Sequence, residues 1–326
     1  MSQLGAMRGW ETVELASDVL AATVVPGKGG DIVSVRYLPA DVELLWRSPW
    51  GLRQRGAIAN LPDDIGTYMD GYPGGWQTIF PNGGDPVVEH GAQWGMHGEV
   101  CATPFDFDLP GDETVVLHAV LVRSPFEITK QVRVTGDRLE LTETITNQGG
   151  EPIEVMWSHH PAFGPPLLGG ACRLEAAART VLVDDVRDTA SGDLAIGGRG
   201  TWPAAPAKDG TEIDLGAVPP PGAGIDRMAY LTDFDRGWVA LRNPDAGLAV
   251  ELDWDAELFP HAWYWLEANG QTGFPWYQRA YVMAVEPATS IPGQGIQAAR
   301  AKTGTQITFD PGQTRQAVIG LRVGPA

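Results

Sequence analysis

Two neighbouring segments alternate apolar and polar side chains with a period of two, and this pattern constrains the fold more than any other feature of the sequence. Over 126–134 and 138–146, alternate positions are apolar and the positions between them are polar. Lys130 and Glu143 are exceptions, because each is charged at an apolar position. Successive side chains of a β-strand point to opposite faces, so the pattern predicts two strands. The Thr-Gly-Asp sequence at 135–137 predicts a hairpin between them, and we expect Glu143 at a margin of the sheet.

Shorter strand-like runs recur along the chain, separated by turns that contain Gly and Pro. They lie at 20–46, 248–254, 262–266, 279–285, 305–309 and 316–321. Only 295–302 predicts a helix, whereas 47–72 is interpreted as irregular loop and 190–224 as a Gly- and Pro-rich excursion. Many short strands without intervening helices predict an all-β protein, built as a large antiparallel β-sandwich with little helix. We find no repeat and no boundary, so we expect one domain over 1–326.

Composition narrows the classes of partner. Hydrophobic residues make up 43% and charged residues 20% of the chain, as in a globular protein with a large core. The formal net charge of −18 argues against nucleic acid or an anionic membrane surface as a partner. We find neither a secretion signal nor a run of about 18 apolar residues, so we expect no membrane span and a cytoplasmic location. Cys101 and Cys172 lack the flanking residues of a zinc or redox motif and are expected to be reduced.

The stretch from Gly74 to Gly98 combines paired glycines, a Pro-Asn-Gly turn, two tryptophans and two histidines. Glycine permits unusual backbone angles and lets a ligand approach the main chain closely, so this density predicts a shaped surface. The stretch contains His97, the first of four positions that are candidates for chemistry. The others are His160 in the WSHHPAF sequence, Asp226, and Glu286 at the end of an apolar strand.

Each candidate also has an ordinary structural interpretation. A His or Asp at a strand end more often makes a structural hydrogen bond, whereas a Glu that closes an apolar strand is unusual because Glu is rarely buried without a partner. Adjacent strand residues face opposite ways, so at most one of His159 and His160 would enter a given cleft. We expect no bound metal, although a triad of His97, His160 and Glu286 stays open as an alternative.

At these positions the chain resembles a known family. GGWQTIFPNGG at 74–84, GMHG at 95–98, His-Pro-x-Phe at 160–163, the Asp226 segment and VEP at 285–287 occur in the same order as in the aldose 1-epimerase, or galactose mutarotase, family. The resemblance covers most of the chain. It implies a galactose mutarotase-like supersandwich with a sugar cleft along one face of a sheet.

The resemblance also implies roles for individual residues. Glu286 would be the general base and His160 the general acid, while His97 and Asp226 would bind sugar hydroxyls. The resembling Gly-rich stretch adds two expected sugar-binding residues, which are Asn82 and Trp76. The chain departs from the family where Ala162 replaces a frequent aromatic residue and where Arg227 follows the Asp. These departures leave the identity of the sugar open.

The chemistry of anomer exchange fits the same two residues. Interconverting α and β anomers requires removal of a proton from the anomeric hydroxyl and delivery of one to the ring oxygen, which a carboxylate and an imidazolium on opposite sides of the sugar would perform. We expect a charged His160 and a deprotonated Glu286 before the first transfer, and no cofactor. The expected partner is a small-molecule sugar or sugar phosphate. The sequence leaves open whether Arg53, Arg55 or Arg227 binds a phosphate.

Three other functions remain alternatives at this stage. They are a non-catalytic carbohydrate-binding protein on the same fold, a polysaccharide lyase or hydrolase, and a metal-dependent sugar isomerase. A hydrolase usually needs two suitably spaced carboxylates, and the sequence offers one clear candidate. The sequence does not decide whether the protein forms a homodimer.

Overall fold

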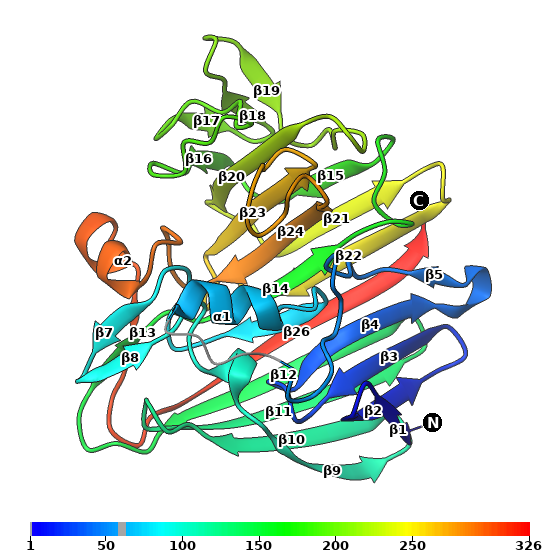
Figure 1. The fold of residues 1–326 in the computed structure, drawn as a ribbon, viewed down its shortest axis with the longest axis vertical. Coiled ribbons are helices and arrows are strands. Elements are labelled where there is room, and N and C mark those ends of the chain that lie inside the picture. Colours follow the sequence, from blue (N-terminus) through cyan, green and yellow to red (C-terminus); the bar gives the residue numbers. More distant parts are fainter. Residues whose placement is uncertain (1, 58–62) are drawn as a thin grey trace.

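The computed structural model describes residues 2–57 and 63–326. Two large antiparallel sheets pack against each other, as Figure 1 shows, which confirms the predicted all-β sandwich. The described residues contain two α-helices, α1 (Asp64–Gly71) and α2 (Ile296–Lys302), and two 3-10 turns at Leu38–Ala40 and Val100–Ala102. The prediction of little helix is therefore also confirmed.

The larger sheet has twelve strands among the described residues, and its centre carries the candidate site. In spatial order they are β1 (Ser2–Met7), β2 (Trp10–Ala16), β3 (Leu20–Val25), β4 (Asp31–Tyr37), β6 (Trp76–Ile79), β14 (Ser158–Phe163), β24 (Tyr281–Ala288), β23 (His261–Ala268), β20 (Ile225–Thr232), β16 (Thr180–Val183) and β17 (Arg199–Thr201), with β5 (Val42–Glu43) paired to β4. The strands β6, β14 and β24 are far apart in the sequence, yet they are neighbours at the centre of this sheet.

The second sheet has eight described strands. In spatial order they are β15 (Arg173–Ala176), β21 (Gly237–Asn243), β22 (Leu248–Trp254), β26 (Thr314–Pro325), β12 (Arg138–Asn147), β11 (Phe126–Thr135), β10 (Thr114–Val120) and β9 (Asp106–Gly111). The predicted hairpin is formed by β11 and β12. The part of the chain that the structure describes also forms three two-stranded sheets. They pair β7 (Val87–Glu89) with β8 (Ala92–Trp94), β13 (Ile153–Val155) with β25 (Ile307–Phe309), and β18 (Ala204–Pro206) with β19 (Glu212–Asp214).

The central strands of the larger sheet are covered on both faces. Along β24, Met283 and Val285 belong to the core between the two sheets. Val282 and Ala284, which point the other way, belong to a second buried cluster on the outer face. That cluster is rich in aromatic residues, including Trp46, Tyr72, Trp265 and Trp276. Because both faces are buried, these strands read as nearly continuous apolar runs in the sequence.

The pairing of these strands aligns four side chains in a row across the outer face. The pairs Ser158 with Ala288 and Ala162 with Ala284 set β14 against β24, and they place His160 opposite Glu286. Glu286 in turn pairs with Trp263 on β23, and Trp263 pairs with Tyr230 on β20. Directly opposed residues share a face of the sheet, so the side chains of His160, Glu286, Trp263 and Tyr230 project together.

A buried ionic network lies between the sheets. Lys130 and Glu143 are cross-strand partners, with side chains 2% and 0% exposed, and Lys130 Nζ lies 3.4 Å from Glu143 Oε1. His159 Nε2 lies 3.3 Å from Glu143 Oε2. Burial alone raises the pKa of Glu143, but His159 and Lys130 outweigh it and lower the pKa to about 2. The prediction that Glu143 lies at a sheet margin is therefore wrong, because its carboxylate is paired in the core.

The helix α1 lies within the segment that was predicted to be irregular loop. Asp63 caps it, because its side chain accepts a hydrogen bond from the backbone N–H of Ile65, and Asp64 occupies the first turn. The acidic pair thus marks a helix start rather than solvated loop. The predicted short helix is confirmed as α2. No helix in the described part of the chain is long and apolar enough to cross a membrane.

Replacing Lys130 with Met should lower the free energy of unfolding by about 3 kcal/mol, because the carboxylate of Glu143 stays buried without that cation. Urea denaturation followed by tryptophan fluorescence measures the change. Lys302→Met is the control, because it breaks an exposed ion pair with Asp185 and should cost less than about 1 kcal/mol. Equal stability of Lys130→Met and the wild type would contradict a stabilising role for this network.

Candidate active site

A cavity of about 450 Å³ lies over the row of four side chains on the outer face of the larger sheet. This size is within the usual range for small-molecule sites. The walls come from α1, from the Gly-rich stretch, and from the loops after β16, β23 and β24. The residues that line it include Tyr68, Tyr72, Gly84, Asp85, His97, His160, Asp184, Arg187, Tyr230, Trp263, Trp265, Gln271, Phe274, Trp276 and Glu286.

His160 and Glu286 lie side by side on the floor of this cavity. His160 Nε2 is 3.6 Å from Glu286 Oε1, and both side chains are almost fully buried. That separation is longer than a hydrogen bond. The second carboxylate oxygen, Oε2 of Glu286, is buried and accepts no hydrogen bond from the described residues. The Tyr72 hydroxyl lies 3.4 Å from His160 Nδ1 and contacts the imidazole from the side of α1.

Burial shifts the pKa values of this pair away from the charged state that the sequence analysis expects. Desolvation raises the pKa of Glu286 well above its usual value. Desolvation also lowers the pKa of His160 to about 4. These shifts favour a neutral pair over the expected ion pair, with the proton on Glu286 and an unprotonated His160. The two groups are also adjacent rather than on opposite sides of the cavity.

His97 reaches the same cavity because the Gly-rich stretch bends sharply around it. Its backbone has a φ of 57°, in the left-handed region, and a Cβ on the following Gly98 would lie only 2.3 Å from the carbonyl oxygen of Phe80. The Gly84 backbone N–H donates to His97 Nδ1 at 3.2 Å. Burial and the neighbouring His160 lower the pKa of His97 to about 3. The neutral ring thus carries its proton on Nε2 and can donate it to a ligand.

The strand β14 separates its two histidines as expected. His160 lines the cavity, whereas His159 points into the core and meets Glu143. Two predicted sugar-binding residues of the Gly-rich stretch do not line the cavity. Trp76 is buried in the core between the sheets, and its Nε1–H points to His159 Nδ1 at 3.4 Å. Asn82 accepts a hydrogen bond from the Ile296 N–H and so joins the stretch to α2.

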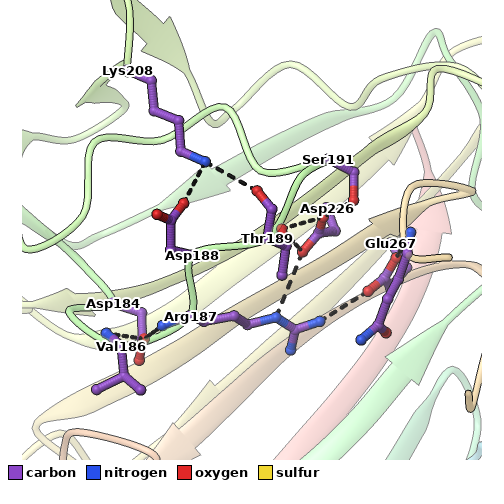
Figure 2. Close-up of polar contacts among 10 residues, drawn as sticks. Asp184, Val186, Arg187, Asp188, Thr189, Ser191, Lys208, Asp226 and Glu267 are labelled. Carbon is purple, nitrogen blue, oxygen red and sulfur yellow. Dashed lines mark hydrogen bonds and ion pairs between the residues drawn. The ribbon is translucent and has the colours of Figure 1, made fainter. Parts of the chain in front are cut away.

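Asp226 is buried beside the cavity but does not line it. Its carboxylate accepts hydrogen bonds from the hydroxyls of Thr189 and Ser191 and lies beside the Arg187 guanidinium (Figure 2). Asp226 Oδ2 is 3.6 Å from Arg187 Nε. The Arg187 Nη2 donates to Glu267 Oε1 at 2.9 Å. Asp226 therefore orients Arg187, which does line the cavity.

Sequence reasoning missed several residues that line this cavity. Arg187 and Asp184 come from the loop after β16, and Tyr68 and Tyr72 come from the helix α1 or its end. The Asp63 cap was a local signal for α1. No local signal identified Arg187, because its carboxylate partners come from β20 and β23.

The described residues contain no group of three His, Cys, Asp or Glu side chains placed to hold one metal ion. His97 and His160 do approach each other, with ring centroids 5.9 Å apart. The metal triad considered for His97, His160 and Glu286 therefore finds no support in the arrangement of these side chains.

The free energy of unfolding should fall as the pH is lowered from 7 to 5, partly because of His97. The unfolded chain protonates this residue near pH 6.5, whereas the folded protein keeps it neutral to about pH 3, so the unfolded state binds more protons in this range. The contribution of His97 is about 2 kcal/mol. Urea denaturation at both pH values should show a smaller fall for His97→Asn. An equal fall in both proteins would contradict burial of a neutral His97.

Comparisons with known proteins agree with this architecture. The family model described as Domain of unknown function (DUF4432) matches residues 7–323. A galactose mutarotase-like protein from Clostridium acetobutylicum is 15% identical, with a TM-score of 0.70 over 100% of this chain and 99% of that chain. A galactose mutarotase related enzyme from Lactobacillus acidophilus is 15% identical, with a TM-score of 0.66 over 96% and 97% of the two chains.

A third solved structure, the Slr1438 protein from Synechocystis sp. PCC 6803, is 17% identical, with a TM-score of 0.69 over 97% of this chain and 96% of that chain. No curated protein matches the chain in sequence. Likeness at these identities shows the fold and confirms the predicted galactose mutarotase-like sandwich. The chain belongs to the DUF4432 family of domains of unknown function.

Proposed function

We propose that this protein is an aldose 1-epimerase-like isomerase, a mutarotase that interconverts the α and β anomers of a free sugar. The observation that carries the proposal is the pair formed by His160 and Glu286, 3.6 Å apart on the floor of an aromatic cavity. An acid and a base of this kind, buried together, suit proton transfers at two oxygen atoms that are bonded to the same carbon. The fold shared with galactose mutarotase-like proteins agrees with the proposal.

The reaction needs one proton on the pair. The anomeric oxygen O1 and the ring oxygen O5 are both bonded to C1, so adjacent residues can serve both atoms. Glu286 donates its proton to O5 as His160 removes the proton from O1, the C1–O5 bond breaks, and a C1–O1 double bond forms. This assignment exchanges the roles that the resemblance implies, because burial favours the proton on Glu286 and an uncharged His160. Rotation about C1–C2 exposes the other face of the aldehyde. Ring closure returns one proton to O1 and one to Glu286, which restores the neutral pair.

Other side chains of the cavity would hold the sugar in place. His97 can donate from Nε2 to a sugar hydroxyl. Trp263 and Trp265 form part of the floor beside Glu286 and suit stacking against the apolar face of a pyranose. We infer that Asp226 orients Arg187 and does not itself bind the reacting sugar ring.

The charges around the cavity favour a neutral sugar over a sugar phosphate. The carboxylates of Asp85 and Asp184 line it, and Arg187 is the one Lys or Arg among the described lining residues. Arg187 already pairs with Glu267. Arg227, considered for phosphate binding, instead donates to both oxygens of Asp193. A phosphate would therefore enter a site with little free positive charge.

Arg53 and Arg55 also contribute no positive charge to the cavity. Neither residue lines it, and the Arg55 guanidinium lies 5.8 Å from the centre of the Trp10 ring. Arg53 and Arg55 therefore do not alter the preference for a neutral sugar.

Replacing Glu286 with Gln should reduce accelerated mutarotation at least about 100-fold, because the amide neither donates nor accepts the transferred proton efficiently. Polarimetry of freshly dissolved α-anomers measures the rate, and circular dichroism checks the fold. Glu251→Gln on β22 of the second sheet is the control and should retain the wild-type rate. Near-normal mutarotation by Glu286→Gln would refute the proposed chemistry. If the wild-type protein binds sugars but does not accelerate mutarotation, the result would favour a carbohydrate-binding protein.

The pH dependence of kcat/KM should reflect the neutral pair. Because burial lowers the pKa of His160 to about 4, its base form persists on the acid side and activity should fall only near pH 4. On the alkaline side, activity should decline as Glu286 loses the proton that its raised pKa retains. Rates measured from pH 3.5 to 10, corrected for spontaneous mutarotation, report both limbs. An acid limb near pH 6.5 would contradict a buried, neutral His160.

A further inference from the structure

The cavity extends along the strands beyond the proposed catalytic pair. On β23, Trp263 lies opposite Glu286, Trp265 follows on the same face, and Glu267 is four residues beyond Trp263. At about 3.3 Å per residue, this spacing places Glu267 about 13 Å from the catalytic row. Trp263 and Trp265 both line the cavity, and the end near Glu267 is lined by Arg187 and Gln271. The cavity thus has two ends, each with its own polar groups.

Two buried carboxylates hold Arg187 at the far end. Asp226 and Glu267 are cross-strand partners, with side chains 2% and 0% exposed, whereas the Arg187 side chain is 31% exposed. Figure 2 shows the guanidinium reaching both carboxylates. Among the described residues these contacts involve Nε and Nη2, which leaves the N–H groups of Nη1 available to donate. The Arg187 backbone N–H is also fixed, because it donates to Asp184 Oδ1 at 2.7 Å.

A second polar side chain lies beside Arg187. The Gln271 backbone N–H donates to Glu267 Oε2 at 3.3 Å, so Gln271 and Arg187 share one carboxylate. The Gln271 Oε1 atom is buried and accepts no hydrogen bond from the described residues. A buried acceptor is unfavourable unless a water or a ligand supplies a donor. Phe274, which is 51% exposed, lines the cavity from the same loop and offers an aromatic face.

We propose that Arg187 and Gln271 form a second sugar subsite, which binds a further ring joined to the ring that reacts at Glu286. The substrate class is then a reducing disaccharide or a longer oligosaccharide. Guanidinium donors, a carboxamide acceptor and an aromatic face together match the hydroxyls and the apolar face of a sugar. Asp226 and Glu267 balance the charge of Arg187, which favours neutral hydroxyls over an acidic substituent. The inference rests on the proposed function, because it places the reducing end of the substrate at Glu286.

Replacing Arg187 with Gln tests the subsite through substrate preference. The probes are maltose, cellobiose and melibiose, each compared with glucose, and β-1,4-galactobiose compared with galactose. In the wild type, at least one disaccharide should have a kcat/KM about tenfold or more above that of its monosaccharide. Arg187→Gln should reduce this ratio about tenfold, mainly through KM. No preference for any disaccharide, or an equal loss for disaccharide and monosaccharide in the variant, would overturn the subsite.

Arg138→Gln is the matched control. Arg138 also lies between two carboxylates, with Nη1 2.6 Å from Asp253 and Nε 3.5 Å from Glu140, and its side chain is 24% exposed. It belongs to the second sheet and does not line the cavity. This variant should keep the wild-type preference, so a changed preference in Arg138→Gln would count against a specific role for Arg187.

Calorimetric binding to Glu286→Gln separates the subsite from the chemistry. We expect Glu286→Gln to bind at least one disaccharide more tightly than its monosaccharide, and the Glu286→Gln/Arg187→Gln double variant to lose this difference. This result would support the subsite even if the wild-type protein accelerates no mutarotation. In that case the proposed reaction fails and the subsite stands. Equal binding of every disaccharide and its monosaccharide would remove the subsite even if mutarotation is observed.

Discussion

The register of the central strands is the constraint on which the rest of the molecule depends. Pairing of β14 with β24 and of β24 with β23 sets His160, Glu286 and Trp263 in one row. A shift of one residue in either pairing would place neighbouring side chains of this row on opposite faces of the sheet. The aromatic cluster on the outer face, which includes Trp276, covers the same strands and encloses the cavity. Fold and site are thus specified by the same set of hydrogen-bonded pairs.

Buried carboxyl groups on the two faces of the larger sheet differ in whether a cation lies beside them. In the core, Glu143 is paired with Lys130 and His159, so its burial is offset. Facing the cavity, Glu286 is buried without a cation, and desolvation raises its pKa and so favours the uncharged form. The first arrangement stabilises the sandwich. The second favours a transferable proton in an apolar site, as the proposed exchange of protons at O1 and O5 requires.

Much of the fold follows from period-two patterns that are local in the sequence, which is why the β11–β12 hairpin and the all-β class could be predicted. The buried ionic network and the cavity depend on contacts between strands that are distant in the sequence, and a local period-two pattern does not reveal those contacts. Glu143 was misplaced because its partnership with Lys130 and His159 joins three strands. His97, His160 and Glu286 were identified by residue type and resemblance, yet their neutral state follows from burial. The role of Asp226 beside Arg187 depends on a loop from a distant part of the chain.

The most direct test of the central claim is the rate at which freshly dissolved α-anomers of neutral aldoses, and of their 6-phosphates, approach equilibrium with and without the wild-type protein. For sugars whose optical rotation changes little, NMR exchange spectroscopy at equilibrium measures the same interconversion from the signals of the two anomers. A neutral acid–base pair in an acidic cavity predicts acceleration for at least one neutral sugar, and less for its phosphate. Sugar binding without acceleration across the whole panel would contradict it.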